Sequence, residues 1–310
     1  MTTLRYTFAE KEARCETLFR ELSPCWHLYT AENFEIIFVT DDDFRAGMLL
    51  IALCAMSFPG IKILAFQLMN NHLHVTLSGK KDDCCAFFHM FRHRLQMYLK
   101  GIGRTVDLSR WEEKLNAIED LDYLRTVIAY TNRNGFLVDP DETPFTYRWG
   151  TNRLFFNPDA VSWHSHSKEK LTVRQIRNVI HSGAFDHMAV LNVIDGYISP
   201  IVFCDITAAM ALYRDGHHYF HLISRDVEGQ RKIAAELGEL VYYTDNELFA
   251  AIVSICRKDY GIGKPSALPS DAKLALARRM HFEYNATDKQ IARILHLDRD
   301  ILRAMFLSGR

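Results

Sequence analysis

The sequence has no excess of charge of either sign. Its 310 residues include 37 Lys and Arg against 38 Asp and Glu, for a net charge of −1. A near-neutral chain has no global field that attracts nucleic acid, so any such contact has to come from local patches. A chain of this length exceeds one compact core of typical size, and we expect two or three domains.

The sequence also lacks cysteine pairs with zinc spacing, and it lacks long apolar runs. The seven cysteines are odd in number and scattered, without a C-x-x-C pair, which indicates a reducing cytoplasm. The first residues lack an apolar signal core, and no stretch approaches the roughly 20 apolar residues of a membrane span. We see neither internal repeats nor low-complexity tracts. These absences predict a cytoplasmic protein without a membrane partner.

The first half of the chain alternates between strand-like and helix-like patterns. Asn70-Asn71 suits a tight hairpin between two of the strands. β-prone segments occupy residues 26–30, 34–39, 61–69 and 72–77, and helical patterns occupy 43–57, 83–100 and 120–134. This order predicts an α+β domain, a small antiparallel sheet with helices on one side.

The second half reads as an all-α region. Residues 168–260 are mainly helical, and 260–270 have the Gly, Pro and Ser content of a linker. Three short helices follow, over 271–284, from a capping box at 287–290, and from Asp298 to about Leu307. We therefore expect domains at 1–158, 159–268 and 269–310.

Two histidines lie one residue apart in the stretch LMNNHLHVTL. In a strand His72, His74 and Thr76 share one face, and they stand opposite Leu73, Val75 and Leu77. The two histidines are then about 7 Å apart, close enough to reach one divalent cation. The alternative is a solvent-facing polar row, and a second H-x-H in a Ser-rich segment at 164–166 shows that spacing alone does not decide.

A possible partner lies on the helix at 120–134. Placing its residues at 100° intervals puts Tyr130 and Asn134 together, nearly opposite the apolar stripe of Leu121, Leu124 and Ile128. An aromatic side chain aimed away from the core stripe, with an amide one turn later, is unusual for core packing. Tyr123 shares that side of the helix, so the pattern leaves two candidate tyrosines.

Over residues 20–157 the sequence resembles the HUH superfamily, and within it the single-tyrosine transposases and the REP-associated tyrosine transposases. LMNNHLHVTL is similar to that family's LMPNHxHLL, with Asn70 or Asn71 where Pro is usual. The other matching segments are 26–30, 41–45, VIAYTNRN at 127–134 and PFTYR at 144–148. The resemblance implies a ferredoxin-like HUH nuclease domain.

The resemblance also implies roles for individual residues. His72 and His74 would be metal ligands, Tyr130 rather than Tyr123 the nucleophile, and Asn134 the third ligand that completes the site. The cofactor would be a divalent cation, Mg²⁺ or Mn²⁺; two imidazoles and an amide suit Mn²⁺ at least as well as Mg²⁺, which prefers oxygen ligands.

The implied activity is cleavage of single-stranded or hairpin DNA and strand transfer through a 5′-phosphotyrosine intermediate, as in DNA transposition and recombination. Related enzymes act as dimers in which the tyrosine uses the partner's histidines, so a homodimer is possible here too. The sequence leaves open whether Tyr130 uses its own histidine pair or a partner's. One alternative is a relaxase or replication initiator of the same superfamily. The other is a DNA-binding regulator that has lost cleavage.

Cations mixed with aromatic residues are the candidate contacts for single-stranded DNA. They are Arg92, His93, Arg94, Tyr98 and Lys100 on one helix, and Tyr147, Arg148, Trp149 and Arg153 after the next, and the competing interpretation is a solvated helix face. The last three helices resemble a helix-turn-helix with Arg299, Asp300 and Arg303 exposed, which would bind duplex DNA. The competing interpretation there is a three-helix protein-binding bundle.

Overall fold

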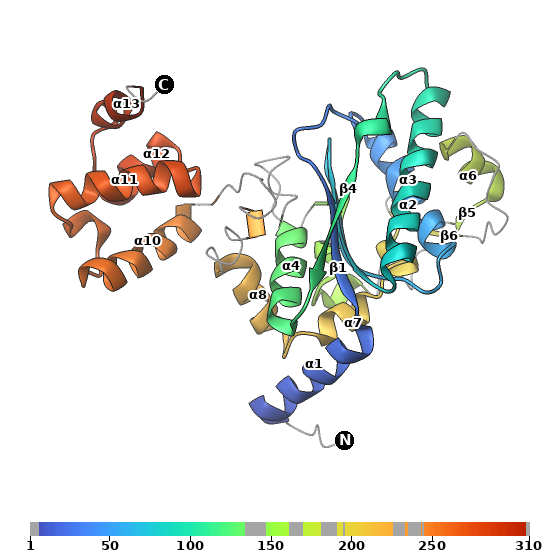
Figure 1. Cartoon of the computed structure of the whole chain (residues 1–310), viewed down its shortest axis with the longest axis horizontal. Helices are drawn as coiled ribbons and strands as arrows, with labels where there is room; N and C mark the ends of the chain where they lie inside the picture. The colour runs from blue at the N-terminus through green and yellow to red at the C-terminus, as the bar shows by residue number, and fades with distance from the viewer. Residues whose placement is uncertain are drawn as a thin grey trace. The chain divides into compact units, whose positions relative to one another are not determined.

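The computed structural model of the chain describes residues 6–133, 147–160, 170–180, 191–194, 196–225, 233–234, 243 and 245–307. They group into two compact units, Met1–Phe220 and His221–Arg310 (Figure 1). The first unit is α+β and contains a four-stranded antiparallel sheet. The finer domain limits expected at residues 158 and 268 stay predictions.

The sheet is built from β1 (Cys25–Thr30), β2 (Lys62–Leu68), β3 (Leu73–Ser78) and β4 (Glu113–Ile118), in the order β2-β3-β1-β4. The first three strands were predicted; β4 was not. The predicted β-prone segment at 34–39 is irregular instead. Its Ile37 and Phe38 amides both donate to Asn70 O at 2.8 Å, so the hairpin turn, rather than a strand, satisfies them.

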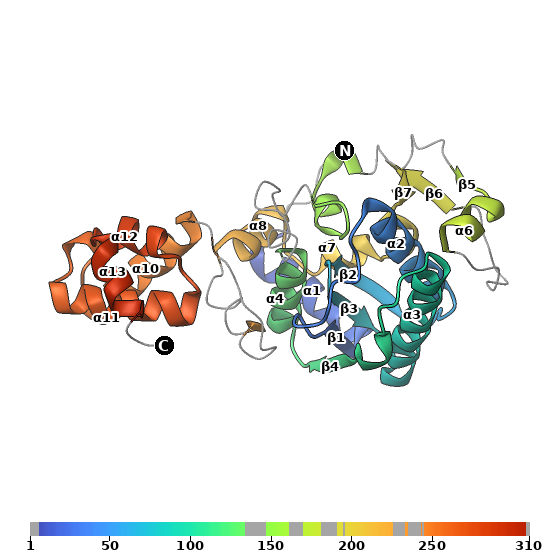
Figure 2. The ribbon, with the colours of Figure 1, turned by 90° about the horizontal axis from the view of Figure 1, so that it is seen from above.

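Helices cover both faces of this sheet. On one side α2 (Asp41–Met56) packs with α3 (Lys81–Gly101), and on the other lies α4 (Leu121–Arg133) (Figures 1 and 2). The prediction of helices on one side was therefore wrong. Every residue of β3 is buried, which requires cover on both faces.

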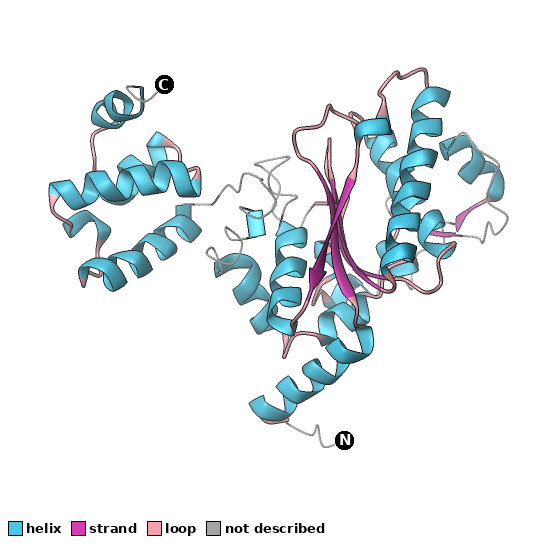
Figure 3. Ribbon diagram, viewed as in Figure 1, coloured by secondary structure: helices cyan, strands magenta, loops and turns pink. Residues whose placement is uncertain are grey.

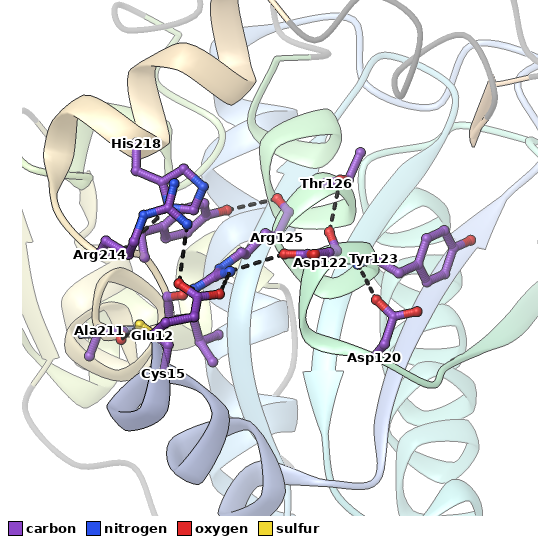
Figure 4. Close-up of polar contacts among 12 residues, drawn as sticks. Glu12, Cys15, Asp120, Asp122, Tyr123, Arg125, Thr126, Ala211, Arg214 and His218 are labelled. Carbon is purple, nitrogen blue, oxygen red and sulfur yellow. Dashed lines mark hydrogen bonds and ion pairs between the residues drawn. The ribbon is translucent and has the colours of Figure 1, made fainter. Parts of the chain in front are cut away.

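Helix α4 is fixed from its outer side by a buried arginine (Figure 4). Arg125, whose side chain is 1% exposed, pairs with Glu12 of α1 (Phe8–Leu22) at 2.6 Å and donates through Nε to Leu212 O at 2.7 Å. Tyr213 donates to Arg125 O at 2.8 Å, and Arg214 also pairs with Glu12 at 3.1 Å. Leu212 to Arg214 join α7 (Ile206–Ala211) to α8 (Gly216–Arg225), so three helices are tied to α4.

The part of the chain after α4 is not all-α. A small sheet of β5 (Lys170–Leu171), β6 (Leu191–Ile194) and β7 (Tyr197–Ile198) lies beside α6 (Val173–Ile180) and α2 (Figure 3). The prediction of an all-α region over 159–268 was wrong here, because strands of two to four residues are too short to show a period-two pattern.

The second unit contains α10 (Asp245–Tyr260), α11 (Ser270–Tyr284), α12 (Asp288–Leu295) and α13 (Arg299–Leu307). The predicted capping box is present, since the Thr287 hydroxyl accepts from Gln290 N and the Gln290 side chain returns to Thr287 N. His296, in the left-handed conformation with φ 53°, ends α12 and makes the turn. The three helices predicted at the C-terminal end are thus confirmed.

None of the helices that the structure describes is both long and apolar enough to cross a membrane. The longest of those whose limits are given above, α3 with 21 residues, carries Asp82, Asp83 and Lys100 in its terminal turns.

The ion pairs of Glu12 with Arg125 and Arg214 form a clamp on α4, and substitution of Glu12 tests it. Hydrogen bonds from Arg125 and then Arg214 lower the pKa of the Glu12 carboxyl, although its burial opposes the shift. A lowered pKa in the folded state stabilises the protein above the ordinary carboxyl value of about 4.3 and is lost as the pH falls through the folded value. Glu12→Gln should therefore lower the free energy of unfolding by about 2 kcal/mol at pH 7, and by less as the pH approaches 3.

Urea unfolding across this pH range measures the effect. Glu21→Gln, at an exposed position of the same helix, is the control and should change stability by less than about 0.5 kcal/mol. Equal stability of Glu12→Gln and the wild type at pH 7 would show that the clamp contributes nothing.

Candidate active site

His72, His74 and Tyr130 converge between the sheet and α4. The ring centroids of His72 and His74 are 5.1 Å apart with planes at 89°, and the Tyr130 ring lies 5.7 Å from His74 at 84°. All three side chains are buried, with exposures of 4%, 0% and 2%. The structure therefore brings together a histidine pair and a phenol from segments nearly sixty residues apart.

Strand parity sets the direction of the histidines. Thr76, on the same face as His74, approaches Thr131 of α4 with 3.5 Å between the hydroxyl oxygens. The predicted parity is therefore confirmed, but the solvent-facing interpretation is wrong. Helix α4 closes over this face of the sheet.

Tyr130 rather than Tyr123 lies beside the histidine rings. Its ring is 6.5 Å from His27 as well as 5.7 Å from His74. Tyr123 lies seven residues earlier on the same helix, about 10 Å along its axis. Figure 4 shows it pointing away from the Arg125 side of α4, near Asp120, whose carboxylate accepts from Tyr123 N at 2.7 Å.

His27 is a site residue that the sequence reasoning missed. It is 0% exposed on β1, and its Nε2 lies 3.2 Å from His74 Nδ1. Tyr29 pairs directly with His74 in the sheet, and its ring stacks at 6.3 Å and 12°. Alternation along β1 could have placed His27 and Tyr29 on one face, but the register that sets them beside His74 comes from long-range strand pairing.

Gln67 is a second polar residue that the sequence did not single out. It pairs with His74 from β2 and is 0% exposed. Within the described residues neither atom of its amide has a hydrogen-bond partner. A Cβ on Gly150 would lie 2.3 Å from Gln67 Oε1, so any larger residue there would displace the amide. Gln67 thus extends the buried polar surface around His74.

Asn71, at or next to the position where Pro is usual in the family motif, orients the His72 ring. Its Oδ1 lies 2.7 Å from His72 Nδ1, and its Nδ2 donates to Phe34 O at 3.2 Å and also to Glu32 O. Because the amide nitrogen is engaged as a donor, the oxygen faces His72 and accepts from its Nδ1–H. The lone pair of His72 is therefore on Nε2.

Burial keeps the three histidines neutral. Loss of water lowers the pKa of His74 to about 3. The same loss of water, and secondarily the neighbouring His74, lower the pKa of His27 and His72 well below the usual value. Neutral imidazole is the form that binds a metal ion, so the site is ready for a cation without losing a proton.

The residues present fit a divalent cation. Two neutral imidazoles with near-perpendicular rings come from His72, just before β3, and His74, within it, a donor set that suits Mn²⁺. The third predicted ligand, Asn134, lies outside the described residues. Among the residues that the structure describes, no three or more His, Cys, Asp or Glu side chains are arranged to hold a metal ion.

The predicted DNA contacts on α3 lie away from this cluster, because α3 covers the opposite face of the sheet from α4 (Figure 2). The predicted DNA contact of Tyr98 is wrong. Tyr98 is 4% exposed and donates to Asp43 Oδ1 at 3.1 Å, so its ring offers no stacking surface. Arg92 donates to Trp111 O at 3.2 Å, and Lys100 is exposed. Burial raises the pKa of the Cys54 thiol on α2, and the positive charge of Arg94 opposes this rise.

The cations after α4 are partly committed to the fold. Arg148 lies over the Trp149 ring at 5.3 Å and 3.5 Å from Asp41. Arg153 donates to Tyr197 OH and lies over that ring. Trp149 and Tyr147 are 6% and 5% exposed, and Tyr147 donates to Leu68 O at 2.7 Å, so neither ring is a base-stacking platform.

In the second unit, Arg299 and Arg303 are exposed on α13, as predicted. Arg303 lies 3.6 Å from Asp300, one turn earlier. Ile291 and Leu295 of α12 are buried, which is the packing expected for the second helix of a helix-turn-helix.

Comparison of the chain with protein-family models, with curated proteins and with solved structures gives no match. The resemblance to the HUH superfamily therefore depends on the sequence motifs. A chemical role for the cluster depends on the geometry of His72, His74 and Tyr130 and is a proposal.

Proposed function

We propose that this chain is a metal-dependent DNA strand transferase of the HUH superfamily, similar to single-tyrosine transposases. The observation that carries the proposal is the position of the Tyr130 ring, 5.7 Å from His74 and on the same side of the sheet as His72. A phenol and two neutral imidazoles are the residue types that such chemistry requires.

The topology supports a ferredoxin-like nuclease domain. From β1 to β4 the elements run β-α-β-β-α-β, and the strand order is β2-β3-β1-β4. Helix α4, which follows β4, returns across the other face and brings Tyr130 to the strand that carries His74.

Tyr130 is the nucleophile in the proposed reaction. Its Oη attacks the scissile phosphorus, the bond from phosphorus to the 3′ oxygen breaks, and a 5′-phosphotyrosine and a free 3′-hydroxyl result. The phenol loses its proton and the departing 3′ oxygen gains one. A phenol of pKa about 10 reacts slowly at neutral pH unless the phosphate is polarised.

His72 and His74 would hold the cation, with Asn134 as the proposed third ligand. The cation, when bound, supplies positive charge at the phosphate oxygens. One phosphodiester is exchanged for another, so a new strand can be joined without a nucleotide cofactor. The bond energy is thus kept in the phosphotyrosine link, which distinguishes a strand transferase from a hydrolytic nuclease.

The burial of Tyr130 and His74 limits the access of a DNA phosphate. With Tyr130 2% exposed and His74 fully buried, a DNA phosphate enters only after α4 shifts from the sheet or exchanges with that of another copy. The same burial favours a second candidate, a DNA-binding regulator in which cleavage is lost and α11 to α13 bind duplex DNA.

The first test is covalent capture. The protein is incubated with Mn²⁺ and labelled single-stranded hairpin DNAs, then denatured. We expect an adduct with the wild type, none with Tyr130→Phe because the nucleophilic oxygen is absent, and none with His74→Ala. Tyr123→Phe is the matched control, since it removes a hydroxyl two turns away on the same helix, and it should keep the adduct.

An adduct that persists in Tyr130→Phe contradicts the assignment of the nucleophile. A wild type that forms no adduct on any hairpin, yet shifts duplex DNA, supports the regulator instead.

The second test concerns the helix-turn-helix. Arg299→Ala and Arg303→Ala should each weaken duplex binding, and each should reduce the slope of log K against log salt by about 1 if the side chain contacts a phosphate. Arg278→Ala, at an exposed position of α11, is the control. Equal weakening by all three variants, measured by fluorescence anisotropy over a salt series, would contradict a recognition role for α13.

A further inference from the structure

His27 is placed directly behind His74 and is not among the expected ligands. Its Nε2 is 3.2 Å from His74 Nδ1, a hydrogen-bond distance for two ring nitrogens that share one proton. Within the described residues its Nδ1 has no hydrogen-bond partner. In that part of the chain, His74 is therefore the polar contact that orients this buried ring.

Two proton arrangements are compatible with this contact. If His74 Nδ1–H donates to His27 Nε2, the lone pair of His74 is on Nε2. If His27 Nε2–H donates instead, the proton of neutral His74 is on Nε2, and that atom cannot bind a cation. The arrangement of the pair thus decides whether His74 is a ligand.

The neighbouring His72 has the first arrangement. Asn71 Oδ1 accepts from His72 Nδ1–H at 2.7 Å, which leaves the lone pair on Nε2. Two ligands that bind one cation through the same ring atom would each need an acceptor behind Nδ1. Asn71 supplies it for His72, and His27 is the group in the matching position behind His74.

We propose that His27 is a positioning residue that accepts a hydrogen bond from His74 Nδ1 and thereby keeps His74 Nε2 for the cation. The inference depends on the proposed cation site. It assigns His27 no contact with the cation. Partners of this kind orient a ligand histidine and raise its basicity.

The test measures Mn²⁺ affinity by calorimetry, without DNA. His27→Phe fills the same space but removes the acceptor, and it should weaken Mn²⁺ binding by about 10-fold to 100-fold. His27→Gln keeps an acceptor near the position of Nε2 and should restore affinity to within about threefold of the wild type. His281→Phe is the control, because His281 also has an Nδ1 without a partner among the described residues but belongs to the second unit.

A second measurement on the wild type keeps the proposal testable if His27→Phe does not fold. In the protein loaded with Zn²⁺ as a diamagnetic probe, ¹⁵N NMR should find the His74 proton on Nδ1 and none on Nε2. A proton on His74 Nε2 overturns the proposal.

The outcomes distinguish failure of the role of His27 from failure of the cation site. Mn²⁺ binding that is lost in His74→Ala but unchanged in His27→Phe overturns the role of His27 and leaves the cation site in place. Absence of Mn²⁺ binding to the wild type overturns both.

Discussion

The packing of α4 against the histidine face of the sheet is the contact on which the rest of the first unit depends. It buries Tyr130 beside His74, and it is held from behind by Arg125, which binds α1 and the chain between α7 and α8. A second buried link joins Asn132 of α4 to Tyr219 of α8 at 2.9 Å, and Thr151 donates to Asn132 Oδ1 at 2.7 Å. Segments far apart in the sequence therefore fix one helix, and that helix carries Tyr130, the proposed nucleophile.

This packing also determines the electrostatics of the site. Because α4 excludes water, the histidines are neutral and their polar contacts come from within the protein, Asn71 behind His72 and His27 beside His74. A neutral, oriented pair of imidazoles is prepared for a cation, whereas the same pair on a wet surface would be mobile and partly protonated near pH 6.5. The closed state that prepares the ligands also shields them, so opening at α4 is a necessary step of the proposed reaction.

The sequence predicted elements with strong periodicity and failed where long-range contacts decide. The first three strands, α2, α3, α4 and the three C-terminal helices follow clear patterns. Edge strand β4, with the mixed composition EKLNAI, does not. The burial of Tyr98, by contrast, was predictable. It shares the apolar stripe of α3 with Phe91 and Leu95, and that stripe already excludes the predicted contact with DNA. His27 needed the β1–β3 register, which no local pattern contains.

A cation held by His72 and His74 would lie beside the Tyr130 ring. Paramagnetic broadening by Mn²⁺ measures this in protein with labelled histidine and tyrosine rings. The rings of His72, His74 and Tyr130 should broaden first as Mn²⁺ is added, before Tyr123 and before the tyrosines of the second unit. Broadening that begins elsewhere, for example near the acidic first turn of α2, and leaves the Tyr130 ring sharp would contradict it.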